Sequence, residues 1–138
     1  MQIRYGLTGM ALLCATAAAS QNFTTAAEVR PILQATKPNW VAVRDYDGQD
    51  WLYFTQILSW RCGLSDIWFS VNDGPEERLV MEECHVDTNA PNTMRSERLE
   101  QFLRTYPPGS VRSVAIRLVL DDGTEDSAEY DRKAVEIP

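Results

Sequence analysis

The chain has 138 residues and a mass of 15.6 kDa, which suffices for one ordinary domain and is too short for two. Hydrophobic residues make up 44% of it and charged residues 24%, a globular balance that excludes collagen-like, low-complexity and polytopic membrane chains. The formal net charge is -7, from 20 acidic and 13 basic residues, so nucleic acid and anionic membrane surfaces repel the chain and we predict neither as a partner.

The first residues have the pattern of a secretory signal peptide. Arg4 supplies the positive charge, and a mainly apolar stretch follows over residues 5–19. This stretch is shorter than the roughly 20 apolar residues of a membrane-spanning helix, so we predict no stable membrane insertion after cleavage. Ala17 and Ala19 place small side chains before Ser20, as at a signal cleavage site. The alternative is a retained helix, which two glycines and two threonines weaken.

A second possible cut lies before Glu28, where Thr25 and Ala27 provide the small side chains. We expect the first cut. The predicted organisation is a signal peptide over residues 1–19, an N-terminal extension over 20–38 and a β-sandwich domain over 39–138. The exported protein is then periplasmic or secreted.

Two cysteines remain once residues 1–19 and Cys14 are removed. Cys62 and Cys84 are natural partners for one disulfide in an oxidising compartment, and closing a loop of this length stabilises a fold by about 3 kcal/mol on the chain-entropy model. The rival is a metal site that also uses His85. The paired cysteine spacings of a structural zinc site are missing, so we predict no metal and no cofactor.

Alternating hydrophobicity with turn residues between the segments predicts antiparallel strands. Trp51 to Trp60 is apolar on both faces and predicts a long central strand, and Ser96 to Arg104 predicts a short helix or an irregular crossover. The other expected strands, in chain order, are Trp40 to Arg44, Ile67 to Val71, Leu79 to Glu83, Ser113 to Leu120 and the arm that carries Ala128 and Tyr130.

These strands favour an all-β fold, a small antiparallel β-sandwich with one disulfide. Two cues indicate an immunoglobulin-like or fibronectin type III-like topology: an alternating strand that runs into Asn72-Asp73-Gly74, and another that ends in Asp121-Asp122-Gly123. The spacing of Cys62 and Cys84 is far shorter than that of the inter-sheet bridge of immunoglobulins, so we expect the bridge to tie neighbouring segments. A small barrel is the main alternative.

Five segments together resemble a group of small exported alphaproteobacterial proteins. They are Glu28 to Leu33, Asn39 to Arg44, Gly48-Gln49-Asp50, Ser59 to Leu64 and Lys133-Ala134-Val135, and they extend over nearly the whole mature chain. That group has no assigned activity. The resemblance therefore implies a periplasmic location and carries over no functional residue.

The polar residues form no catalytic motif of high specificity. Asp45 to Asp50 gathers carboxylates around a glycine, but a calcium loop needs a glutamate where Gln56 stands, so we predict a hairpin turn. His85 is the one histidine, and its neighbour Cys84 would point to the opposite face of a strand, which gives a poor Cys-His pair. Arg61, in an otherwise apolar segment, predicts a carboxylate partner.

Aromatic residues are concentrated between residues 40 and 69. Trp60 shares a face with apolar neighbours and is expected in the core. Trp51 and Tyr53 share the opposite face, and Trp68 alternates away from the apolar side of its strand, so these three are the candidate ligand-binding residues of an exposed patch.

We therefore predict a non-catalytic exported binding or accessory module that recognises a protein or another ligand through the sheet edge nearest Trp40 to Arg44 or through an aromatic face. Two alternatives come from other classes. One is a small hydrolase that uses a carboxylate pair in a concave pocket. The other is a carbohydrate-binding module that uses Trp51, Tyr53 and Trp68.

Overall fold

The structure is a computed structural model that describes residues 2, 3, 6, 9, 11 and 22–138. Most of the predicted signal peptide, and its cleavage site before Ser20, lie outside the described residues. None of the helices in the described part of the chain is long and apolar enough to cross a membrane.

The first element is helix α1, Ala26–Thr36, for which the sequence analysis assigned no structure. Its start is fixed by Thr25, whose hydroxyl accepts a hydrogen bond from the Glu28 N–H and donates one to the Glu28 carboxylate. Ala26 is buried, as are Val29 and Leu33 one and two turns later. The helix therefore belongs to the same core as the strands. A short 3-10 turn, η1 (Lys37–Asn39), follows it.

The first sheet, sheet A, contains three antiparallel strands in the order β1-β2-β5. They are β1 (Ala42–Tyr46), β2 (Gln49–Tyr53) and β5 (Leu103–Tyr106). The β1-β2 hairpin turns at Asp47 and Gly48, both with positive φ (51° and 71°), which is the backbone form that tight hairpins need. The hairpin turn predicted for the acidic segment is thus confirmed.

The long central strand predicted over Trp51 to Trp60 is wrong. The strand ends at Tyr53, and two short helical turns follow, α2 (Thr55–Leu58) and η2 (Arg61–Gly63). Phe54, Ile57 and Leu58 are all fully buried, and their spacing of three and four residues is that of one helix face. A continuous apolar run does not distinguish a buried strand from a buried helical turn.

The second sheet, sheet B, contains four antiparallel strands in the order β4-β3-β6-β7. They are β3 (Leu64–Val71), β4 (Glu77–Arg78), β6 (Ser113–Leu120) and β7 (Glu125–Asp131). In β6 every second residue is buried, as its sequence predicts: Val114, Ile116, Leu118 and Leu120. A last helical turn, α3 (Arg132–Val135), follows β7.

The segment between β4 and β5 is largely irregular, so the return strand expected over Leu79 to Glu83 is not formed. The predicted helix or crossover over Ser96 to Arg104 consists of one 3-10 turn, η3 (Leu99–Gln101), and the start of β5.

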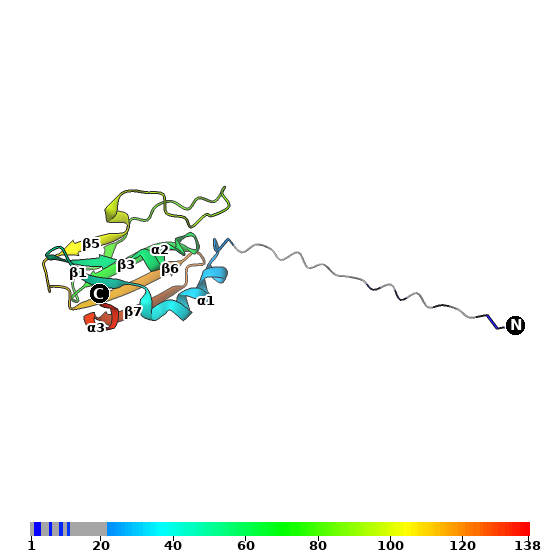
Figure 1. Ribbon diagram of the computed structural model, residues 1–138, viewed down its shortest axis with the longest axis horizontal. Helices are drawn as coiled ribbons and strands as arrows, with labels where there is room; N and C mark the ends of the chain where they lie inside the picture. Colours follow the sequence, from blue (N-terminus) through cyan, green and yellow to red (C-terminus); the bar gives the residue numbers. More distant parts are fainter. Residues whose placement is uncertain (1, 4–5, 7–8, 10, 12–21) are drawn as a thin grey trace.

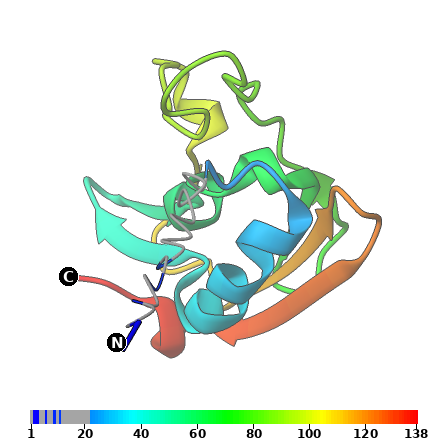
Figure 2. The same ribbon diagram turned by 90° about the vertical axis from the view of Figure 1, so that its right-hand side faces the viewer.

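One core joins the two sheets and α1, and Figures 1 and 2 show the helix lying alongside the strands. Val43 and Leu52 contribute from sheet A, and Ile67 and Phe69 from sheet B. The Phe69 ring lies 4.8 Å from that of Phe54, measured between centroids. The prediction of antiparallel sheets with one Cys62–Cys84 disulfide is confirmed; the bridged Cα atoms lie 5.3 Å apart.

Candidate functional site

The outer side of sheet A carries a row of four side chains, Arg44, Tyr46, Trp51 and Tyr53, which we call the aromatic face. The pairing of β1 and β2 sets Arg44 opposite Trp51. Because side chains alternate along a strand, the buried Val43 and Leu52 point inward and these four point outward.

Contacts within the aromatic face hold its rings in place. The centroids of Tyr46 and Trp51 lie 5.8 Å apart with the rings edge to face, and those of Trp51 and Tyr53 lie 6.3 Å apart with planes inclined by 27°. The Arg44 guanidinium carbon lies 4.4 Å from the centre of the Tyr46 ring, a cation-π contact. The Trp51 Nε1–H donates to the Tyr46 carbonyl oxygen at 3.0 Å. The row is therefore ordered before any ligand arrives.

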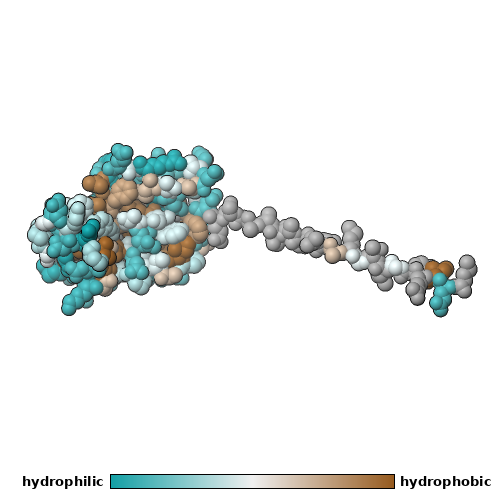
Figure 3. Space-filling view, in the orientation of Figure 1, coloured by the Kyte–Doolittle hydropathy of each residue, from teal (hydrophilic) through white to brown (hydrophobic). Residues whose placement is uncertain are grey.

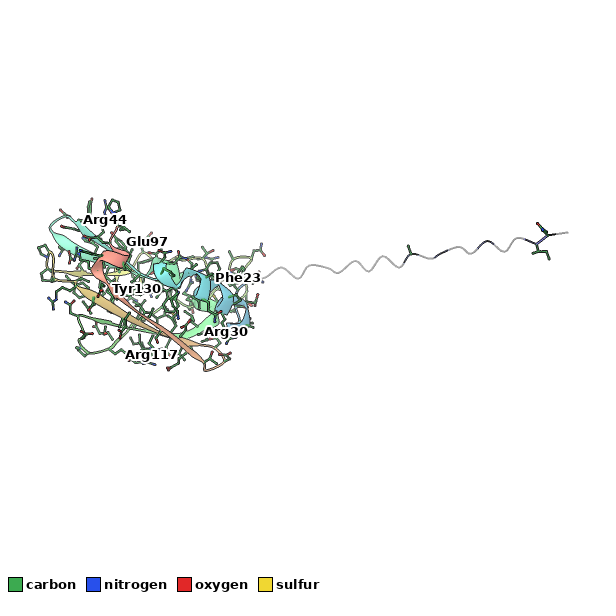
Figure 4. All side chains as sticks on the ribbon, turned by 90° about the horizontal axis from the view of Figure 1, so that it is seen from below. Phe23, Arg30, Arg44, Glu97, Arg117 and Tyr130 are labelled. Carbon is green, nitrogen blue, oxygen red and sulfur yellow. A yellow bond between two sulfur atoms is a disulfide. The ribbon has the colours of Figure 1, made fainter. Side chains whose placement is uncertain are left out.

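A shallow hollow of about 420 Å³ adjoins the aromatic face and shares Arg44 and Tyr53 with it. Its other lining residues are Ala42, Thr55, Gln56, Ile137 and Pro138. Arg44 has the one charged side chain among these seven residues. Figure 3 shows a small apolar group at this end of the domain, where the chain end meets β1 in Figure 1. Figure 4 places Arg44 at the opposite end of the domain from Phe23.

Of the three predicted ligand-binding residues, the structure brings Trp51 and Tyr53 together and places Trp68 elsewhere. Trp68 lies on β3 of sheet B, where the Arg117 guanidinium carbon is 5.3 Å from the centre of its ring. Arg117 is held in turn by Glu76 and Glu125, whose hydrogen bonds raise its pKa. The expected three-residue patch is therefore divided between two sheets.

The predicted ligand-binding residues did not include Tyr46, Gln56, Ile137 or the side chain of Arg44. The signal for Tyr46 was available, because the turn at Asp47 and Gly48 fixes the register that brings it next to Trp51. Ile137 carried no local signal, because its place depends on where α3 directs the chain.

The remaining tryptophans line the interior. Trp40 is fully buried, and its Nε1–H donates to the Leu33 carbonyl oxygen at 2.9 Å. Trp60 is partly buried against the core, and its ring lies 5.1 Å from that of Phe23, measured between centroids.

Asp50 is a fully buried carboxylate at the inner side of sheet A. The Arg132 guanidinium donates to both of its oxygens, at 2.5 and 3.1 Å, and the backbone N–H groups of Gly109 and Val111 each donate at 3.0 Å. The hydrogen bonds from Arg132 are the main reason that the pKa of Asp50 is lowered to about 2. The carboxylate thus fastens the loop before β6 and helix α3 to sheet A.

Arg61 is buried and organises the irregular segment that follows β4. Its guanidinium donates to the carbonyl oxygens of Leu58, Glu82, Glu83, Asn92 and Thr93 and to the Glu82 carboxylate. The predicted carboxylate partner is therefore present, but most of the bonds are to the backbone.

Glu82 completes this cluster. Its carboxylate accepts hydrogen bonds from the N–H groups of Arg95 and Ser96 and lies 2.6 Å from His85 Nε2. Burial is the largest single influence and raises its pKa, but the hydrogen bonds from Arg95, His85 and Ser96 and the Arg61 charge together outweigh it, so the net pKa is lowered. No group of three or more potential metal-ligating side chains occurs in residues 22–138.

Comparison with known proteins adds no assignment. Protein-family models, curated proteins and solved structures were all compared with the chain, and none matches it.

Proposed function

We propose that the protein is an exported, non-catalytic binding module that recognises its ligand through the aromatic face and the adjoining hollow. The observation that carries this proposal is the ordered row of three rings and one guanidinium on a sheet surface, next to a hollow that shares two of its residues. Tyr and Trp offer large contact areas and lose little rotamer freedom on binding, which is why they dominate binding hot spots.

The hydrogen bonds of the buried charged groups indicate that these groups have a structural role. Asp50, Arg61 and Glu82 each bond to backbone groups of segments that the strands do not hold. Such bonds fix loops, and each of the three groups is already engaged by several partners. This distribution favours recognition by the exposed sheet face over catalysis by these groups.

Export is part of the same proposal. The Cys62–Cys84 disulfide supports it, because structural disulfides persist in oxidising compartments such as the periplasm. The signal-peptide pattern of residues 1–19 is consistent with this route, and the resemblance to small exported alphaproteobacterial proteins stays a prediction.

We further propose that the two sheets form a small β-sandwich of the immunoglobulin and fibronectin type III kind. The first, second and fifth strands form one sheet, and the third, sixth and seventh form the core of the other. An immunoglobulin constant domain divides its strands in the same way except for the fourth, which here pairs with the third.

The test is a screen of the purified mature protein against a glycan array and a random peptide array. We expect a ligand whose affinity falls at least tenfold in Trp51→Ala and in Tyr53→Ala, because each is an aromatic contact at the centre of the site. Trp68→Ala is the matched control, since Trp68 is also a partly buried tryptophan and lies on the other sheet. No ligand on either array, or a ligand lost in Trp68→Ala and kept in Trp51→Ala, would contradict the proposal.

A further inference from the structure

The residues after α3 lie against the edge of sheet A. β1 is the outer strand in the order β1-β2-β5, and Val43 pairs in parallel with Glu136. The Ile137 N–H donates to the Val43 carbonyl oxygen at 2.9 Å. Figures 1 and 2 both show the end of the chain running beside β1. The segment Glu136–Pro138, which we call the strap, thus occupies the place of an added strand.

The strap is held lightly. Within residues 22–138, one backbone hydrogen bond joins it to β1. The Ile137 residue keeps 43% of its surface exposed although it lines the hollow. Glu136 is exposed as well, and its carboxylate lies 3.3 Å from Arg132 at the preceding helical turn. By contrast, Val135 immediately before the strap is buried in the core. Displacing the strap would therefore leave the core intact.

We propose that β1 binds an extended polypeptide segment of a partner protein, in parallel orientation, and that the strap fills this place when the partner is absent. The inference rests on the proposed function, because the hollow beside β1 is part of the same site. The strap itself shows what fits there: an extended backbone that donates to Val43, with an aliphatic side chain in the hollow. A partner strand that adds to a sheet edge gains affinity from main-chain hydrogen bonds and specificity from pockets for alternate side chains.

A partner segment that extends along all of β1 would make more main-chain hydrogen bonds than residues 136–138, which bond to β1 at Val43. The side chains of the partner segment would lie next to Tyr53 and Arg44. We therefore expect the segment to carry an aliphatic residue that fills the hollow and a carboxylate that strengthens binding by pairing with Arg44. A strap held by one net hydrogen bond is displaced in about one molecule in six, so releasing it fully would strengthen partner binding about sixfold.

The substitution Ile137→Pro releases the strap selectively. Proline has no N–H to donate to Val43, and the residue before it, Glu136, already has the extended backbone (φ -70°, ψ 131°) that a following proline favours. The experiment selects peptides from a displayed library of random decapeptides on the full mature Ile137→Pro protein. Each recovered peptide is then synthesised and titrated against Ile137→Pro and the unmodified protein, with backbone amide shifts recorded by NMR.

We expect recovered peptides to shift the amides of β1, to bind Ile137→Pro about sixfold more tightly than the unmodified protein, and to lose affinity when their own central amides are N-methylated. No recovered peptide, equal affinity for both proteins, or binding that N-methylation leaves unchanged would overturn the inference. If a glycan binds at the aromatic face and loses affinity in Trp51→Ala while no peptide is recovered, the inference fails and the proposed function stands. If no ligand depends on Trp51 or Tyr53 and no peptide meets the three criteria above, both fail.

Discussion

Replacing Asp50 by asparagine removes the charge of the fully buried carboxylate with little change of shape. The pKa of Asp50 lies at about 2 in the folded protein against 3.8 for the ordinary side chain, a difference that corresponds to about 2 kcal/mol of folding free energy at neutral pH. Asparagine also offers one acceptor oxygen where two are used, so a buried N–H of Gly109 or Val111 loses its partner at a cost of about 1–3 kcal/mol. Because the hydrogen bonds from Gly109 and Val111 already contribute to the lowered pKa, the two costs overlap, and we expect Asp50→Asn to lower the free energy of unfolding by about 2–4 kcal/mol at pH 7.

The pH dependence of this loss tests the reasoning. Because the folded-state pKa is below the unfolded one, the charge contribution of Asp50 is complete above about pH 5 and is lost as the pH falls toward 2. Urea unfolding of both proteins between pH 7 and pH 3 should therefore show the difference shrinking with acidity. Asp47→Asn, an exposed turn residue whose positive φ asparagine tolerates, is the control and should change stability by less than about 0.5 kcal/mol. A difference that is absent at pH 7, or that stays constant down to pH 3, would refute the account.

Three further predictions concern the rest of the fold. Arg61→Lys should lower the free energy of unfolding by about 3 kcal/mol, because an ammonium group cannot reach all the carbonyl oxygens to which the guanidinium donates. The same change should raise amide hydrogen exchange over residues 79–98. Unchanged exchange there would contradict the role of Arg61 in holding this segment. The bridge closes a loop with a sequence separation of 22, so the double variant Cys62→Ser, Cys84→Ser should have a free energy of unfolding, measured with urea, about 3 kcal/mol lower than that of the unmodified protein. The unmodified mature protein should show no free thiol in a thiol assay. The intact mass of the exported protein should correspond to a start at Ser20, since a start at Glu28 would remove the Thr25 cap and the buried Ala26 of α1.

The regular strands were accessible from sequence because one of their faces is buried. Large apolar residues occupy every second position from Val114 to Leu120, and the turn residues after them fix the hairpin, so β6 and the start of the returning strand β7 followed from the pattern. The prediction for the run from Trp51 to Trp60 failed because the period of burial changes within it. Leu52 and Phe54 are buried at strand spacing, and the next buried residues, Ile57 and Leu58, follow at helical spacing.

The irregular segment after β4 was beyond sequence reasoning for a different reason. Its conformation depends on Arg61, which is distant in the chain and satisfies carbonyl groups that a strand would otherwise pair. Helix α1, in contrast, is signalled in the sequence by the Thr25-to-Glu28 capping pair.

The candidate site was predictable in part. Period-two spacing placed Trp51 and Tyr53 on one face, and the structure has both there. Trp68 satisfies the same rule on its own strand, but the assignment of strands to sheets decides which outward residues meet. The contributions of Tyr46, across the hairpin, and of Ile137, from the far end of the chain, required the three-dimensional arrangement.

The most direct measurement of the central claim follows the indole N–H resonances of the four tryptophans by NMR while the best ligand from the two arrays is added. The account predicts that the Trp51 resonance shifts with the ligand, because its ring lies between Tyr46 and Tyr53 on the aromatic face, and that the Trp68 and buried Trp40 resonances stay in place. A ligand that saturates the protein while moving the Trp68 resonance and leaving that of Trp51 unchanged would contradict it.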